Sequence, residues 1–444
     1  MGLMNLLKRT GYSLAILLIG VPLSLAQAQP DSLQQDPVES ASATLSKNLS
    51  DFAAEQADLA HRSALEQARA QTLATRVSAV ISTQSVLGQG SLDWLAGQSD
   101  PAVTGLQPVS GREGLLVSYL IPSNDPLSFL IGRSWTYDNA VAAAAFLAQG
   151  QTSRAKSVLD ALNRLVAADG SIGFSYQVNS LEYDSRIRTG TVAWVGYVLA
   201  LYQRQTGDTL FQATSERIAS YLKTLQLASG SLKGGPDVSW ASTEHNIDAY
   251  FFFRELYRVT GNGSYLTTAG QIKNSLLTNH WIGGRNPHFL QGIGDSTPAL
   301  DANSWGAIFL WATGRSTQAN QALKYVESSF KNSQKISGST TRINGYAPDA
   351  ARKTIWIEGT LGVAMAYQRY GNTLKADSIL NDISTLQSTW ETQGRWHGAL
   401  PFAMPRYTNL DGDTFAEFES VTSTGWENLL LALRSGSTLF WNQD

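Results

Sequence analysis

The chain contains no cysteine, and this absence excludes disulfide bonds, thiolate metal sites and a lipid-anchored cysteine. Only 16% of the 444 residues are charged, whereas 43% are hydrophobic, so the chain has enough apolar side chains for a large core. Histidine is also scarce, and the spacing of the five histidines is not that of zinc ligands. The sequence therefore predicts neither a metal site nor a cofactor.

Long hydrophobic runs are absent beyond the N-terminus. There, Lys8 and Arg9 precede an apolar stretch at 14–25 and a small-residue cleavage site at 26–28. The apolar stretch is too short for a membrane span. We predict a signal peptide over 1–28, a periplasmic or secreted location in a bacterium, and no integral membrane segment after cleavage.

The chain also lacks a basic excess. After residue 28 it has 31 basic and 36 acidic residues, a net charge of about −5. Because phosphate binding depends on positive charge, nucleic acid is not the predicted partner. Residues 29–64 are rich in Ser, Gln, Ala and Asp, and we interpret them as a linker or a loosely docked helix. The remaining 65–444 is predicted to be one domain, and its oligomeric state is not indicated.

From Trp135 onward the sequence repeats about every fifty-five residues. In each unit a polar loop leads into a very apolar helix, and an amphipathic helix follows. The apolar helices are predicted to end at glycines, which accept the left-handed C-cap conformation: Gly150, Gly207, Gly261, Gly314, Gly371 and Gly436. The amphipathic helices are predicted over 153–166, 211–225, 264–277, 318–330 and 374–386.

Helices that are apolar all round belong inside, and those with one polar face belong outside. Six inner and about six outer helices predict an all-α fold, an (α/α)6 toroid. The last inner helix has no outer partner after it, so we expect a helix within 65–81 or 115–120 to take that place. The repeat is also longer than the units of most open solenoids.

Carboxylates recur near the start of the inner helices. Asp138 lies twelve residues before its terminal glycine, and Asp248, Asp301 and Glu358 each lie thirteen before theirs. This counting places all four in the first helical turn, where a carboxylate commonly caps free amide groups. Asp248 is therefore interpreted as a cap. Glu244 and His245 then lie outside the repeat pattern.

Every repeat also has a tryptophan near the same level, and these side chains either fill the ring or line its mouth. They are Trp135, Trp194, Trp240, Trp305, Trp356 and Trp426. Further polar or aromatic groups precede the first, second and sixth inner helices. They are Tyr137, Tyr183, Asp184, Arg186, Arg188, Glu417 and Glu419.

With these repeats and acidic, aromatic loops, the chain from about residue 65 resembles the six-hairpin toroids of glycoside hydrolases, polysaccharide lyases and sugar epimerases. The resemblance implies a carbohydrate substrate and singles out no one family. Glycoside cleavage uses two carboxyl groups, one as acid and one as base or nucleophile. We predict Glu244 as acid or base, with Asp138 and Glu358 as its partners. The predicted substrate-binding residues are Trp135, Tyr137, Tyr183, Asp184, Arg188, Trp240, His245, Asp248, Asp301, Trp305, Trp356, Glu419 and Trp426.

Two alternatives stay open. A lyase or epimerase acting on a uronic-acid polymer would need a cation, such as Arg186, Arg188 or Arg352, and a proton carrier, such as Tyr183 or His245. A toroid without catalysis would bind a glycan during its export or assembly. Residues 409–417 alternate acidic oxygens but fall short of a calcium loop, and we interpret them as a polar turn.

Overall fold

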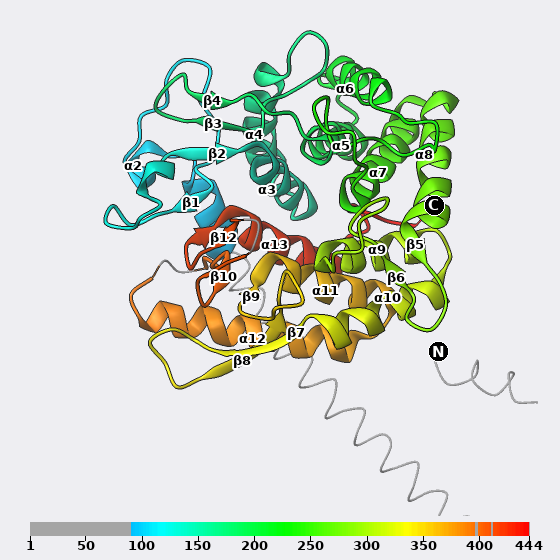
Figure 1. Cartoon of the computed structure of the whole chain (residues 1–444). Helices are drawn as coiled ribbons and strands as arrows, with labels where there is room; N and C mark the ends of the chain where they lie inside the picture. The colour runs from blue at the N-terminus through cyan, green and yellow to red at the C-terminus, as the bar shows by residue number, and fades with distance from the viewer. Residues whose placement is uncertain (1–89, 396–397, 410–411, 444) are drawn as a thin grey trace, which may run out of the picture. The chain divides into compact units, whose positions relative to one another are not determined.

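The computed structural model describes residues 90–395, 398–409 and 412–443 (Figure 1). The predicted signal peptide, the segment 29–64 and the first residues of the predicted domain lie outside this range. The described residues all belong to one compact unit, Ser78–Asp444. In the described part, no helix combines the length and apolar character that crossing a membrane requires.

Six apolar helices form a closed inner ring. They are α3 (Thr136–Ala148), α5 (Thr189–Thr206), α7 (Thr243–Thr260), α9 (Leu300–Ala312), α11 (Ile357–Tyr370) and α13 (Val421–Arg434). Each inner helix packs against the next, and α13 packs against α3, which closes the ring. The (α/α)6 toroid predicted from the repeats is confirmed.

Amphipathic helices surround this ring. They are α4 (Thr152–Leu165), α6 (Gln212–Thr224), α8 (Gly263–Ser275), α10 (Ser316–Ser329) and α12 (Thr373–Thr392), which lie outside their inner partners in Figure 1. The sixth outer position goes to a helical segment at 90–97. Its Ser91 accepts a hydrogen bond from Asn428 of α13, and its Asp93 pairs with Arg154 of α4. The expected helix within 115–120 is absent, because Tyr119–Leu120 forms strand β1.

The glycine stops predicted from the sequence are confirmed. Gly207, Gly261 and Gly371 cap α5, α7 and α11 in the left-handed conformation, with φ of 75°, 68° and 90°. The remaining three also have positive φ, just beyond α3, α9 and α13. Glycine is preferred there because other residues pay a steric cost in this conformation.

Short antiparallel strands, which the sequence did not predict, stiffen the loops between helices. Pairs are formed by β1 with β13 (Glu419–Ser420), β5 (Trp281–Ile282) with β6 (His288–Phe289), β7 (Lys331–Lys335) with β8 (Arg342–Tyr346), β9 (Ile355–Trp356) with β10 (Ala403–Met404), and β11 (Tyr407–Thr408) with β12 (Thr414–Phe415). A three-stranded sheet has the order β2 (Arg133–Trp135), β3 (Ser175–Gln177), β4 (Tyr183–Asp184). The pair β1–β13 joins the first and last repeats, so it supports ring closure.

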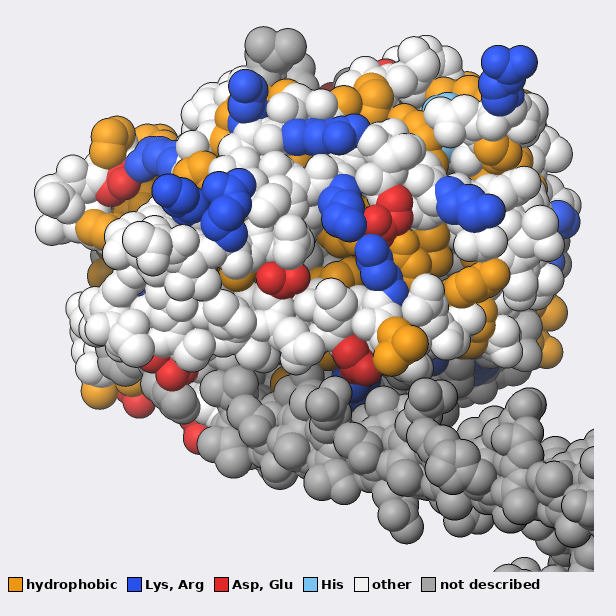
Figure 2. All heavy atoms as spheres, turned by 90° about the horizontal axis from the view of Figure 1, so that it is seen from below, with side chains coloured by type: hydrophobic (Ala, Val, Ile, Leu, Met, Phe, Trp, Pro, Cys, Tyr) orange, Lys and Arg blue, Asp and Glu red, His pale blue; other side chains and the backbone are white. Residues whose placement is uncertain are grey.

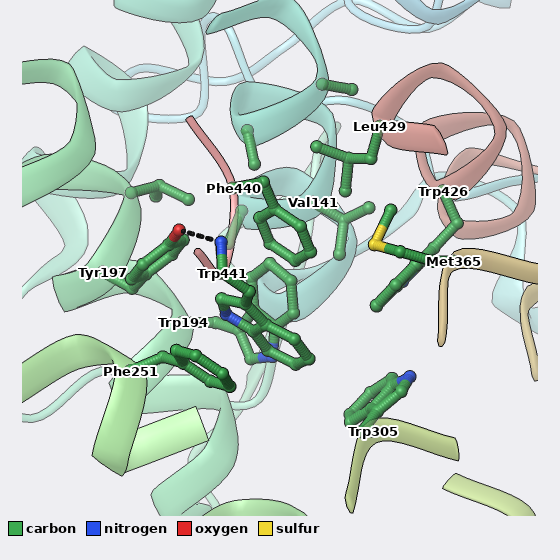
Figure 3. Close-up of a cluster of buried hydrophobic side chains, with 14 of the residues drawn as sticks. Val141, Trp194, Tyr197, Phe251, Trp305, Met365, Trp426, Leu429, Phe440 and Trp441 are labelled. Carbon is green, nitrogen blue, oxygen red and sulfur yellow. Dashed lines mark hydrogen bonds between the residues drawn. The ribbon is translucent and has the colours of Figure 1, made fainter. Parts of the chain in front are cut away.

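The C-terminal segment fills the centre of the ring. Phe440 and Trp441 are 3% and 2% exposed and lie among inner-helix side chains (Figure 3). The backbone amide of Trp441 donates to the hydroxyl of Tyr197, 3.1 Å away. Arginines from three inner helices donate to the carbonyl oxygens of this segment: Arg204, Arg254, Arg258 and Arg369. These bonds satisfy the backbone oxygens of a non-helical segment that would otherwise be costly to bury.

Candidate active site

The N-terminal ends of the inner helices surround a cavity of about 530 Å³. All three residues predicted to be catalytic line it: Asp138 from α3, Glu244 from α7 and Glu358 from α11. A second cavity of about 450 Å³ adjoins it over α7, α9 and the loop before α11. We call the first the central cavity and the second the side cavity. They share Glu244, His245, Asp301, Trp356, Asp413 and Phe415 in their walls.

Glu244, Asp301 and Glu358 occupy equivalent positions in consecutive repeats. Each is the second residue of its helix, because α7 begins at Thr243, α9 at Leu300 and α11 at Ile357. Asp248, by contrast, is the sixth residue of α7 and lies in its second turn. Assigning Asp248 to the first turn was therefore wrong, and Glu244 belongs to the repeat pattern. The count from the terminal glycine failed because α7 has 18 residues, whereas α9 has 13.

A polar residue two positions after each of these carboxyls fixes the helix start. In each case its side-chain oxygen accepts a hydrogen bond from the backbone amide of the residue fourteen positions earlier, in the preceding loop. These polar residues are Asn246, Asn303 and Thr360. The Asn246 amide also donates to the Leu232 carbonyl oxygen at 2.9 Å. The pattern of an acid, any residue, then Asn or Thr was visible in the sequence, and it would have aligned Glu244 correctly.

The carboxyls are not the N-cap groups of their helices, although Asp301 accepts a 2.7 Å hydrogen bond from the Ala302 amide in the first turn of α9. In α3, α9 and α11 the N-cap residue makes no side-chain capping bond, and in α7 the cap is Ser242. Instead, Glu358 accepts a 2.5 Å bond from the Tyr137 hydroxyl, and Asp248 accepts a 3.0 Å bond from the Trp194 indole. Among the described residues, these carboxyls form no ion pair with Lys or Arg. They are therefore left available to a ligand or a proton.

Glu244 and Asp301 are hydrogen-bonded to each other through their carboxyl groups. Burial and the charges of Asp301, Asp248 and Glu358 hold the pKa of Glu244 well above its usual range. Burial also raises the pKa of Asp301, partly offset by its bonds to the Ala302 amide and to Glu244. Burial and the neighbouring negative charges therefore favour the protonated form of Glu244.

Asp138 lies in a different environment, beside Tyr119 and Ser118. Burial raises its pKa to about 7, against the lowering effect of the Ser118 hydroxyl. Its Oδ2 atom has no hydrogen-bond partner in the described part of the chain. Glu358 lies between the two groups. Burial raises the pKa of Glu358 to about 8, opposed by the bond from Tyr137.

His245 lies against the start of α5. A Cβ atom on Gly190 would lie 2.5 Å from the His245 ring and 2.9 Å from a carboxyl oxygen of Asp248, so this contact requires glycine. Burial, together with the charge of Arg188, lowers the pKa of His245 to about 4. The ring is therefore neutral at pH 7. Its Nδ1 atom has no partner among the described residues.

Aromatic side chains form the walls and floor of the central cavity. Of the predicted residues, Trp135, Tyr137, Trp305 and Trp356 line it, and Trp240 lines the side cavity. Trp194 and Trp305 also pack on Trp441, with ring centroids 5.3 and 5.6 Å away, so the C-terminal segment supports the floor (Figure 3). The central cavity is also lined by residues that were not among the predicted site residues: Tyr119, Phe174, Phe402, Phe415, Phe418 and Thr422.

Five predicted substrate-binding residues line neither cavity. Trp426 is fully buried beneath the floor, where it stacks on Trp305 at 5.3 Å and donates to the Tyr137 hydroxyl. Tyr183 is 53% exposed on β4, beside Asp184, which pairs with Arg186. Arg188 pairs with Asp237, and Glu419 borders a separate cavity with Arg395 and Arg406.

Among the described residues, no group of three or more acidic or histidine side chains is arranged to hold a metal ion. Residues 410 and 411 of the predicted polar turn lie outside the described part of the chain. The side-chain oxygen of Asn409 accepts a hydrogen bond from the Asp413 backbone amide at 2.8 Å, and the Asn409 side-chain amide donates to the Asp413 carboxyl at 3.1 Å. Its side chain is therefore used within the hairpin.

Many basic side chains lie on the surface of the unit, whereas Arg112 and Arg254 are buried. On the face shown in Figure 2, Lys and Arg side chains, some of them next to one another, are spread among neutral groups and small hydrophobic areas. No Lys or Arg occurs among the described residues that line the central and side cavities. The site is thus acidic and aromatic.

No protein-family model and no curated protein matches the chain. Among solved structures, it is similar to a glycosidase with a TM-score of 0.59, 13% identity, and coverage of 80% of this chain and 97% of that one. A D-mannose isomerase matches with a TM-score of 0.56, 11% identity, and coverage of 80% and 98%. A family 76 glycoside hydrolase, a mannosidase from Bacteroides thetaiotaomicron, matches with 0.54, 10%, and coverage of 80% and 98%. The fold is the six-hairpin toroid. At these identities the likeness establishes the fold alone.

Proposed function

We propose that the protein is a carbohydrate-active enzyme that hydrolyses a glycosidic bond between neutral sugars. The observation that carries this proposal is the set of carboxyls in one aromatic cavity, whose environments differ. Burial and neighbouring charges hold the pKa of Glu244 well above its usual range, whereas Asp138 has an oxygen without a hydrogen-bond partner among the described residues and a pKa of about 7. Environments that separate the pKa values of two carboxyls create an acid and a base in one site.

In this proposal the Glu244–Asp301 pair protonates the leaving oxygen, with Glu244 as donor. Asp138 takes the proton of the attacking water. Glu358, held by Tyr137, lies near both groups, and its ionised form, which gains population as the pH rises toward 8, stabilises the positive charge that develops on the sugar ring. The aromatic walls suit the apolar CH faces of sugars.

The absence of a lining cation favours a neutral sugar over a uronic acid. Arg186 and Arg188 are paired with Asp184 and Asp237. Arg352 donates to the carbonyl oxygens of Ser328 and Ser329. A substrate carboxylate in the acidic cavity would meet repulsion rather than a partner. The lyase or epimerase on uronic acid is therefore less well supported than hydrolysis. A new absorbing C=C bond in products from a uronate polymer would reverse that ranking.

Aldose–ketose interconversion is the second candidate, because one structural neighbour is a D-mannose isomerase. His245 is the observation that favours it, since a neutral imidazole that lines the cavity is suited to accept a proton from carbon. Incubation with mannose and with fructose, followed by sugar analysis, tests it directly. Conversion that is lost in His245→Asn but kept in Glu244→Gln would favour the isomerase over the hydrolase.

We further propose that the protein acts in the periplasm or outside the cell, on the strength of the N-terminal sequence. A fusion of residues 1–28 to a reporter enzyme that is active only after export tests this proposal. Reporter activity is expected, and cytoplasmic retention would contradict it.

The test of hydrolysis uses the purified protein with nitrophenyl glycosides and with gluco- and manno-oligosaccharides of both anomers. Cleavage of at least one substrate is expected, and Glu244→Gln and Asp138→Asn should each lower kcat by about 10²–10⁴-fold. Glu113→Gln, at an exposed position outside the cavities, is the matched control. In a glycosyl fluoride the leaving group is fluoride, which departs without needing a proton. This substrate should restore much of the rate to Glu244→Gln but not to Asp138→Asn. Equal rates in Glu244→Gln and the control would overturn the assignment.

A further inference from the structure

The two cavities meet at the carboxyl pair. Glu244 and Asp301 line both cavities, whereas Asp138, Asp248 and Glu358 line the central cavity only. Trp356 and Phe415 also line both cavities, as do His245 and Asp413. A ligand that reached from one cavity into the other would therefore pass the carboxyl pair and these aromatic rings.

The walls of the two cavities differ. Away from the junction, the central cavity has a hydrophobic wall of Ile121, Leu127 and Leu130 above its tryptophan floor. The side cavity is more polar and includes Gln291, Thr297, Asp349, Tyr407 and Asn409, together with Trp240 and two prolines. Its volume of about 450 Å³ lies within the roughly 300–1,000 Å³ of small-molecule sites.

Trp240 is held in a fixed orientation in the side cavity. Gly292 lies so close to the indole that a Cβ atom there would collide with the ring. The Tyr407 hydroxyl donates to Asp349 at 3.1 Å on another wall of the same cavity. An indole held in place next to polar groups is suited to a sugar, because the ring contacts the CH face while hydroxyls bond to the polar groups.

We propose that the side cavity binds the sugar that leaves, and that the substrate is at least a disaccharide spanning both cavities. This inference rests on the proposed function. The bond between the anomeric carbon and the linking oxygen breaks at the junction, and its electron pair stays on that oxygen. The oxygen takes the proton of the Glu244–Asp301 pair. Water forms the new bond to the anomeric carbon in the central cavity, and its proton goes to Asp138.

The placement of the carboxyls assigns their roles independently of their pKa values. A group that protonates the linking oxygen must reach the boundary between the two sugars, and of the carboxyls that line the central cavity Glu244, Asp301 and Asp413 do so. Asp413 is hydrogen-bonded to Asn409 within the β11–β12 hairpin, which leaves Glu244 and Asp301 for this role. A group that activates water must lie beside the sugar whose bond is broken, which is the position of Asp138 and Glu358.

The experiment compares two tryptophans, one in each cavity, on two substrates. Trp240→Ala should lower kcat/KM about tenfold on the cleaved oligosaccharide and leave it within about twofold on the glycosyl fluoride of the same sugar, whose leaving group is too small to use the side cavity. Trp135→Ala, in the central cavity, should lower both. Equal effects of Trp240→Ala on the two substrates, or no effect, would overturn the inference.

Two further measurements keep the outcome decisive. Gln291→Ala replaces Trp240→Ala if circular dichroism shows that the tryptophan variant is unfolded. If no glycoside is cleaved, the proposed hydrolysis fails. The side cavity is then judged by calorimetry with maltose, cellobiose and mannobiose. Binding that weakens about tenfold in Trp240→Ala supports a sugar site there. Binding that is unchanged in the variant, or absent from the parent protein, overturns it.

Discussion

The hydroxyl of Tyr137 donates a 2.5 Å hydrogen bond to Glu358, which joins α3 to α11 across the mouth of the ring. The same hydroxyl accepts a bond from the Trp426 indole below the cavity floor. A buried carboxyl at this position depends on its donor, because few other groups in the wall can replace the water it has lost.

Tyr137→Phe should therefore raise the pKa of Glu358 further and weaken its ability to stabilise positive charge. We expect kcat/KM to fall by about tenfold or more while the fold is retained, since one charge-assisted hydrogen bond is worth about 1.5–3 kcal/mol. Steady-state kinetics on the cleaved glycoside measures the loss. Tyr346→Phe is the control, because it removes the same type of bond to Glu327 outside the cavities. Matching losses in the two variants would contradict a specific role for Tyr137.

The activity should rise with pH through neutrality. Asp138 must be ionised to accept a proton, and its pKa is about 7, whereas burial and neighbouring charges hold the pKa of Glu244 well above its usual range. A profile of kcat/KM against pH in the free enzyme should thus show an acid limb near pH 7. Ser118→Ala removes a bond that lowers the pKa of Asp138, so the limb should move upward by about half a unit to one unit. The control Ser333→Ala on β7 should leave the acid limb of the pH profile in place. An acid limb near pH 4 would refute the assignment of Asp138 as the base.

Gly190→Ala should reduce activity sharply. The added methyl group would press on the His245 ring and on Asp248, so both side chains must move within the cavity wall. We expect a loss of about tenfold or more in kcat/KM with a modest loss of stability. Gly270→Ala on the outer helix α8 meets open space and should stabilise the protein by about 0.5–1 kcal/mol without changing the rate. Unchanged kinetics in Gly190→Ala would show that this contact is not required.

Glu427 gives a test of pH-dependent stability outside the site. Burial in α13 raises its pKa to about 8, against the lowering effect of Ser91. Between its ordinary pKa and about 8 the folded state holds the extra proton, so this group makes stability fall as pH rises through that window. Glu427→Gln should remove part of this pH-dependent loss of stability. The melting temperature of the variant should therefore exceed that of the parent protein by a larger margin at pH 9 than at pH 5. Glu113→Gln should show no such difference, and a parallel response in both variants would contradict the argument.

Trp441→Ala should be strongly destabilising. The side chain is 2% exposed and stacks on Phe251 at 4.7 Å and on Phe440 at 4.8 Å. Its removal leaves a cavity, and the free energy of unfolding should fall by about 3–5 kcal/mol, as measured by urea denaturation. Phe129→Ala, which removes an aromatic side chain that is 71% exposed, should change it by less than about 0.5 kcal/mol. Because Trp194 and Trp305 rest on Trp441, activity should also fall.

The repeat architecture followed from the sequence because it depends on local signals. An apolar helix, a glycine that accepts positive φ and an amphipathic helix are each specified within a few turns of chain, and their sixfold repetition leaves ring closure as the packing solution. The same patterns placed Asp138, Asp301 and Glu358 at helix starts, but assigned Asp248 instead of Glu244 to the start of α7. Since parallel inner helices begin at one mouth, all three face one cavity.

Tertiary structure alone decided how these carboxyls are used. The bond from Tyr137 to Glu358 spans 221 positions and that from Trp194 to Asp248 spans 54, and no local pattern encodes such pairs. The C-terminal Phe440 and Trp441 enter the ring centre only because the closed ring leaves an apolar core there to fill. The pairing of Glu244 with Asp301 likewise arises because neighbouring repeats bring equivalent residues together, and burial with the neighbouring negative charges then favours the protonated form of Glu244.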